Sequence, residues 1–214
     1  KQLQRYALNP FAAGSLAKQL TAASEALMSA AHAEDPPVLF ISDSHSRYFE
    51  WIVFEGRLPQ RVAGVCSVSQ ANLYGLFMPS RDVPTRRRIR ESLDRFPSHT
   101  VVVLHIGEVD CRAVYWNLAR RLGPFGKRFV ETITQNFARL LDEIAATHGR
   151  IVVTAPVRPT YHLRPENKVV EGEAILYLTN LLCERMDAEC KARGLAFVSI
   201  NRDLEEFGAD LHNP

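Results

Sequence analysis

The stretch Val38-Leu-Phe-Ile-Ser-Asp-Ser-His-Ser46 decides the fold of this 214-residue chain. Its first four residues are apolar and follow Pro36-Pro37, which predicts one buried strand with a sharp start. A strand buried on both faces is typical of a parallel sheet covered by helices. In such sheets the functional residues lie just beyond the carboxyl ends of the strands, so we expect the polar run Ser42–Ser46 at that edge.

Ser44 is the candidate nucleophile in this run. If Ser44 begins the next helix, its hydroxyl lies near unpaired backbone N–H groups, which favour developing negative charge. The segment alone supports a second interpretation equally well, in which Ser42, Asp43 and Ser44 only cap a helix.

The composition predicts one large α/β domain with a sizeable core, since 46% of the residues are apolar and 23% are charged. A net charge of +2 gives no strong reason to expect a nucleic-acid partner, and no apolar run is long enough to span a bilayer. The four cysteines show no C-x-x-C pair or zinc-like spacing, so we interpret them as reduced thiols, mostly in the core, which favours a cytoplasmic location. The seven histidines are scattered without ligand spacing, and we expect no metal or other cofactor. The chain begins with Lys1 rather than Met, so a preceding segment or other domains of a longer chain could be missing.

Apolar runs alternate with amphipathic stretches along most of the chain. The runs predict strands at 38–41, 61–68, 100–106, 150–155 and 195–200. Helical spacing predicts helices at 47–54, 85–96, 129–144 and 175–186, after an amphipathic helix within 1–33. This rhythm indicates an α/β fold, a three-layer α/β/α sandwich whose five-stranded parallel sheet is joined by right-handed crossovers. We expect a helical extension at 1–34 and the α/β domain at 35–214.

Other polar residues have competing interpretations. The four arginines between 86 and 90 could bind a phosphate or an acidic sugar, but we prefer a solvated helix face near Glu91 and Asp94. We interpret His105, near the end of the third strand, as a buried and hydrogen-bonded core group. The loop after the fourth strand either shapes a substrate pocket or is simply exposed; its polar residues are Arg158, Tyr161, His162 and Arg164.

Three polar segments should meet at the carboxyl edge of the sheet: Ser44, the run Gly107–Arg112 after the third strand, and Asp210 with His212 after the fifth. A serine hydroxyl is a poor nucleophile at neutral pH and needs a base within hydrogen-bond reach. A histidine suits that task, and a carboxylate can hold the imidazole in the correct tautomer and orientation.

These motifs resemble the SGNH (GDSL-like) hydrolase superfamily over most of the chain, from Val38 to His212. The family's Gly-Asp-Ser block is similar to Ser42-Asp43-Ser44, with a serine in place of the glycine. Its Gly-x-Asn-Asp block is similar to Gly107-Glu108-Val109-Asp110, and its Asp-x-x-His block to Asp210-Leu211-His212, which is one residue shorter. The run Gly-Glu-Val-Asp-Cys-Arg resembles a divergent bacterial branch that is often linked to surface polysaccharides.

The resemblance implies a role for each matching residue. Ser44 would be the nucleophile, His212 the base and Asp210 its orienting carboxylate. Val109 stands where the family has an oxyanion-binding asparagine, so another donor would be needed. The candidate oxyanion and substrate-binding residues are Gly75, Asn72, Gly107, Glu108, Asp110 and Arg112, of which Glu108 cannot donate when it is ionised.

The implied function is an SGNH-type serine esterase that removes an acyl group, with acetyl as the best expectation, from a carbohydrate or a small ester. One alternative is acyl transfer to a polysaccharide hydroxyl on the same scaffold. Another is a catalytically degenerate module that binds a glycan or a partner domain, which Val109 and the shortened Asp-x-His motif favour. A flavodoxin-like nucleotide binder is disfavoured, because the chain has no Gly-rich phosphate loop or Walker-type lysine.

Overall fold

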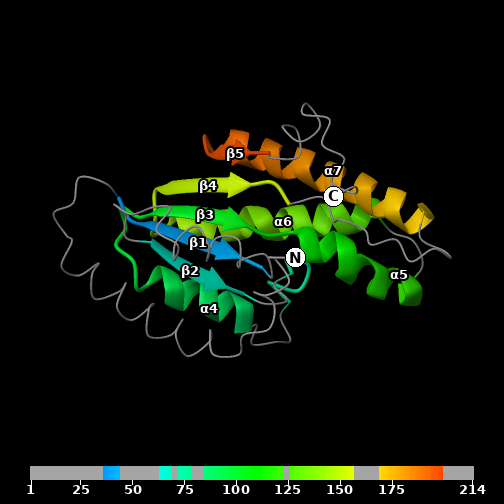
Figure 1. Cartoon of the computed structure of the whole chain (residues 1–214), viewed down its shortest axis with the longest axis horizontal. Helices are drawn as coiled ribbons and strands as arrows, with labels where there is room; N and C mark the ends of the chain where they lie inside the picture. The colour runs from blue at the N-terminus through cyan, green and yellow to red at the C-terminus, as the bar shows by residue number, and fades with distance from the viewer. Residues whose placement is uncertain are drawn as a thin grey trace, which may run out of the picture.

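A five-stranded parallel sheet forms the centre of the molecule. The structure is a computed structural model that describes residues 36–43, 63–68, 72–78, 84–122, 126–156 and 169–199. The strands are β1 (Val38–Ser42), β2 (Ala63–Ser67), β3 (Val101–His105), β4 (Arg150–Thr154) and β5 (Ala196–Val198). They lie in the order β2-β1-β3-β4-β5, every neighbouring pair is parallel, and all the arrowheads in Figure 1 point the same way. The predicted sheet is therefore confirmed.

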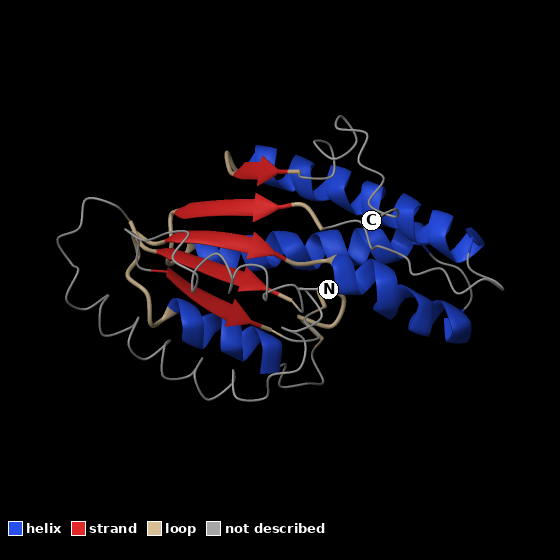
Figure 2. Cartoon of the chain, in the orientation of Figure 1, coloured by secondary structure: helices blue, strands red, loops and turns tan. Residues whose placement is uncertain are grey.

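Long helices connect these strands. They are α4 (Pro84–Leu93), α6 (Gly126–Ala145) and α7 (Val169–Ala192), and Figure 2 shows α6 passing behind the strands. The three predicted helices at 85–96, 129–144 and 175–186 are confirmed, with α6 and α7 longer than expected. The helices predicted within 1–33 and at 47–54, and the domain boundary at residue 34, lie outside the described residues.

The polar segment that follows β3 is helical, which the sequence pattern did not predict. It forms a short π-helical turn, η1 (Asp110–Val114), which continues directly into α5 (Tyr115–Leu122), and α5 lies beyond the strand arrowheads in Figure 1. Glu108, Asp110 and Cys111 are buried there. Aromatic packing explains the helix, because the Tyr115 ring meets the Phe129 ring of α6 edge-on, with 5.3 Å between centroids.

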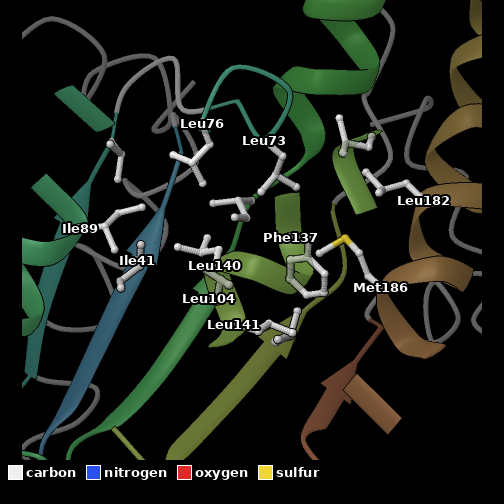
Figure 3. Close-up of a cluster of buried hydrophobic side chains, with 14 of the residues drawn as sticks. Ile41, Leu73, Leu76, Ile89, Leu104, Phe137, Leu140, Leu141, Leu182 and Met186 are labelled. Carbon is white, nitrogen blue, oxygen red and sulfur yellow. The ribbon is translucent and has the colours of Figure 1, made fainter. Parts of the chain in front are cut away.

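Alternation along the strands gives the sheet two buried faces. Leu39, Ile41 and Leu104 belong to the large core cluster, which also holds side chains of α4, α6 and α7. In Figure 3, Ile41 lies beside Ile89 of α4, and Leu104 lies beside Leu140 of α6 in the same cluster. Val38 and Phe40 belong to a second cluster with Val65 and are also buried. Both faces are therefore covered, as in the predicted three-layer sandwich.

The arginines of α4 are mostly a solvated face, as expected. Arg87, Arg88 and Arg90 are exposed, and Arg87 lies 3.8 Å from Glu91 one turn further on. Arg86 differs, because its guanidinium binds both carboxylate oxygens of Glu143 and so ties α4 to α6. This ion pair gives Arg86 a structural role.

Two further observations concern the cysteines and the helices. All four cysteines are free thiols, and Cys66, Cys111 and Cys190 are buried, as the sequence predicts. Among the described helices, none combines the length and the apolar character that crossing a membrane requires.

Candidate active site at the carboxyl edge of the sheet

The strand order creates a switch point between β1 and β3. From β1 the chain moves outward to β2 and then returns to the other side of β1 to form β3. In open parallel sheets, ligands bind in the crevice beyond the carboxyl ends at such a point. The Asp43 N–H donates to the His105 carbonyl oxygen at 3.3 Å, so the end of β1 is joined to the end of β3 here. Asp43 directly precedes the candidate nucleophile Ser44 in the sequence.

Gly107 allows four segments to pack together at this edge. Its φ is +114°, a conformation that favours glycine. A Cβ atom at this position would lie 3.1 Å from both Leu182 Cδ2 of α7 and Pro156 Cγ after β4, and 3.8 Å from Leu73 Cδ1. The loop after β3 therefore packs against the loop after β2, the end of β4 and α7 without room for a side chain.

Asp110 binds the loop that follows β2. Its Oδ2 accepts the Leu73 N–H at 2.8 Å and its Oδ1 accepts the Tyr74 N–H at 2.9 Å. The pKa of this carboxyl group is raised to about 7, because burial and, to a smaller extent, the nearby Asp43 disfavour the charged form by more than the N–H donors of Tyr74 and Leu73 favour it. The carboxylate thus fixes the direction of two consecutive backbone N–H groups at the switch point.

Two asparagines complete the network around this loop. Asn136 of α6 donates through Nδ2 to the Leu73 carbonyl at 2.7 Å and to the Tyr74 carbonyl at 3.2 Å. The Gly75 N–H donates to Asn72 Oδ1 at 2.7 Å. An oxygen atom thus already lies at the Gly75 N–H, at the distance that an oxyanion takes from its donors.

A row of polar side chains crosses the sheet just before this edge. Ser42 of β1 is paired in register with His105 of β3, and Thr154 of β4 directly follows the last residue of that strand that pairs with β3. All three side chains lie on the face of the sheet that carries Val38 and Phe40. The His105 Nδ1 lies 2.7 Å from Thr154 Oγ1, so His105 is a buried, hydrogen-bonded group as predicted. The Ser42 hydroxyl is fully buried and has no hydrogen-bond partner in the described part of the chain.

The structure thus places only part of the predicted site. It brings Asn72 and Gly75 together with Asp110, and it places Gly107 against the same loop. Glu108 follows Gly107 in the sequence and is buried. The backbone of Arg112 lies in η1, and its side chain is not among those that the structure describes. Ser44, Asp210 and His212 lie outside the described residues, as does the loop with Arg158, Tyr161, His162 and Arg164.

Sequence reasoning missed Asn136, because it lies in the middle of a helix and belongs to no motif. Its only sequence signal is a polar residue at helical spacing from Ile133 and Leu140, on the apolar face of α6. Within the residues that the structure describes, no group of three or more His, Cys, Asp or Glu side chains could hold a metal ion.

The chain resembles solved structures in its fold. No family model and no curated protein matches it. An extracellular lipase from Streptomyces rimosus shares 13% identity at a TM-score of 0.53, with 80% of this chain and 82% of the lipase covered. A catalytic mutant of an acetylxylan esterase from Geobacillus stearothermophilus shares 14% identity at a TM-score of 0.52, covering 79% and 80%. A gut microbial diltiazem-metabolizing enzyme shares 17% identity at a TM-score of 0.52, covering 81% of this chain and 40% of that one.

These structures define the class of fold. The parallel order β2-β1-β3-β4-β5, with both faces of the sheet covered, is a three-layer α/β/α fold, which this chain shares with the lipase and the acetylxylan esterase. The predicted three-layer α/β/α fold is therefore confirmed.

Proposed function

We propose that this protein is an SGNH-type serine esterase that removes acyl groups, with acetyl as the first expectation, from a carbohydrate or a small ester. The observation that carries the proposal is the loop at the switch point, where Asp110 and Asn136 hold the backbone of Leu73 and Tyr74. Asp110 occupies the N–H groups of Leu73 and Tyr74, so the loop that it holds can offer the next N–H, that of Gly75, to an oxyanion. The fold shared with a lipase and an acetylxylan esterase agrees with this chemistry.

In the proposed reaction, Ser44 Oγ forms a bond to the acyl carbon while His212 takes the hydroxyl proton and Asp210 orients the imidazole. The carbonyl oxygen becomes an oxyanion, and the bond to the leaving alkoxide then breaks as His212 returns the proton to it. A water molecule attacks the acyl-serine in the same way, so the products are a carboxylic acid and free Ser44. The apolar side chain of Val109 offers no amide to the oxyanion, so backbone N–H groups such as that of Gly75 have a larger share in its stabilisation.

Gly75 and Asn72 would form the part of this oxyanion site whose hydrogen bonds change when the substrate binds. The Gly75 N–H now binds Asn72 Oδ1, and a substrate carbonyl oxygen would replace that acceptor. The displaced Asn72 amide carries an NH₂ group, which is the donor chemistry that Val109 lacks. Gly107 packs against this loop, and Asp110 binds its N–H groups. Arg112 is a further candidate for binding the substrate.

The test is hydrolysis of p-nitrophenyl acetate and of acetylated xylan by the Ser44→Ala variant. We expect the loss of at least 1,000-fold in kcat/KM, since a serine hydrolase without its nucleophile retains only residual catalysis. Ser98→Ala is the matched control, because Ser98 is exposed and precedes β3 at the opposite edge of the sheet. Unchanged turnover in Ser44→Ala would reject the assignment.

A catalytically degenerate glycan-binding module is the second candidate, and Val109 is the observation that favours it. A fluorophosphonate probe separates the two candidates, because only an activated serine reacts with it. Covalent labelling that Ser44→Ala abolishes supports the esterase. A wild-type protein that stays unlabelled but binds an acetylated glycan in calorimetry supports the module. With a labelled enzyme, product analysis in the presence of a sugar acceptor distinguishes hydrolysis from acyl transfer.

A further inference from the structure

Asn136 occupies an unusual place for an amide side chain. It lies ten residues into α6, at helical spacing from Ile133 and Leu140, on a face whose other members are buried and apolar. Asparagine is a poor helix former because its side chain competes for backbone hydrogen bonds. The reason for an amide here therefore has to lie outside the helix.

That reason is the loop after β2, more than 60 residues earlier in the sequence. Asn136 Nδ2 donates to the carbonyls of Leu73 and Tyr74, at 2.7 and 3.2 Å. Two carbonyl oxygens can be bound only by the NH₂ end of an amide, so chemistry alone settles the orientation of this side chain. Asp110 binds the N–H groups of the same two residues from its own side.

Because the peptide bond is planar, these contacts also fix the direction of the Gly75 N–H. In a trans peptide the C=O and the following N–H point in opposite directions, and the described chain has no cis peptide. The Tyr74 carbonyl bound to Asn136 therefore sets where the Gly75 N–H points. The Leu73–Tyr74 peptide is held at both ends, by Asn136 at its oxygen and by Asp110 at its N–H. Rotation of either peptide would break at least one of these bonds.

We infer that Asn136 is a positioning residue for the proposed ester hydrolysis, which aims the Gly75 N–H at the oxyanion by holding the Tyr74 carbonyl. The inference rests on the proposed function of the site. Asn136 touches no reacting atom and acts only through the backbone of the loop. Without its amide, the Tyr74–Gly75 peptide loses the bond at its oxygen and keeps only the bond from its N–H to Asn72, so the N–H is held less firmly for the charge that develops in the transition state.

The experiment compares Asn136→Leu and Asn136→Asp with the matched control Gln135→Leu, whose side chain is exposed on the same helix. Leucine removes the donors at similar volume, and aspartate keeps the shape but places oxygen atoms against the two carbonyls. We expect kcat for p-nitrophenyl acetate to fall 10- to 100-fold in both variants while KM stays within about twofold, because an oxyanion donor acts in the transition state. Gln135→Leu should match the wild type. Unfolding by urea shows which of the two Asn136 variants is folded and can be compared.

Hydrogen exchange gives a readout that does not depend on turnover. By NMR, we expect the Gly75 amide to exchange at least tenfold faster in the Asn136 variants, with exchange at the centre of α6 unchanged. If both Asn136 variants keep the wild-type turnover, if this turnover depends on Ser44, and if the Gly75 amide exchanges at the wild-type rate, the role of Asn136 is overturned and the proposed function stands. Turnover that survives in Ser44→Ala would instead overturn the proposed function, and the catalytic role of Asn136 with it.

Discussion

Asp110→Asn should change how the stability of this protein depends on pH. The carboxyl group of Asp110 is fully buried, and burial raises its pKa from the ordinary 3.8 to about 7. The folded state therefore holds the proton more tightly than the unfolded state does. The favourable contribution is complete below pH 3.8 and is lost as the pH rises to about 7. At roughly 1.4 kcal/mol per pH unit, this displacement corresponds to about 4 kcal/mol of unfolding free energy.

Asparagine has nearly the same shape and does not titrate, so the variant isolates the contribution of the carboxyl group. Urea unfolding followed by circular dichroism at one-unit intervals from pH 4 to pH 8 gives the two unfolding free energies. We expect the wild-type value minus the Asp110→Asn value to fall by about 4 kcal/mol over this range. The matched control is Asp142→Asn. Arg193 holds the pKa of the exposed Asp142 below 3.8, so its contribution is lost only below that pH and the difference stays flat from pH 4 to pH 8.

Two outcomes would refute the reasoning. A constant difference between wild type and Asp110→Asn would mean that the Asp110 pKa is not raised. A difference that grows with pH would mean that the N–H groups of Leu73 and Tyr74 stabilise the carboxylate by more than burial destabilises it.

Three further variants test the packing of the sheet and of the site at its carboxyl edge. Gly107→Ala should lower the unfolding free energy by about 2–4 kcal/mol, because the residue has a positive φ and its Cβ would have contacts of 3.1 Å. Gly149→Ala is the control in thermal unfolding and should be neutral or slightly stabilising, because its Cβ would meet no atom within 4 Å. Gly64→Ala should lower it by about 1–3 kcal/mol, because the new Cβ would lie 2.3 Å from Phe96 Cζ, and adding Phe96→Leu should recover part of that loss in a double-mutant cycle. Ser42→Ala should be neutral or stabilising by up to about 1 kcal/mol, since the buried hydroxyl has no hydrogen-bond partner in the described structure; a clear loss of stability by calorimetry would show that the hydroxyl is bound.

The strands and most of the described helices could be predicted from local patterns. The run Val38–Ile41 is apolar throughout because both faces of β1 are buried, and α6 repeats its apolar residues at helical spacing. The parallel arrangement followed from the alternation of strands and helices, since parallel neighbours need long crossovers. The helix after Gly107 could not be predicted in this way, because the buried polar residues Glu108 and Asp110 interrupt the apolar pattern that identifies a core helix.

By itself, the sequence determined which segments form the sheet and that Gly107 and Asp110 lie at its carboxyl edge. Only the tertiary structure decided what those residues do. Asp110 binds backbone groups 36 and 37 residues away, and Asn136 binds carbonyls 62 and 63 residues away. Local periodicity reflects how a segment buries its own side chains, whereas these bonds satisfy the backbone of another segment. Their partners are known only once the chain has brought the two segments together.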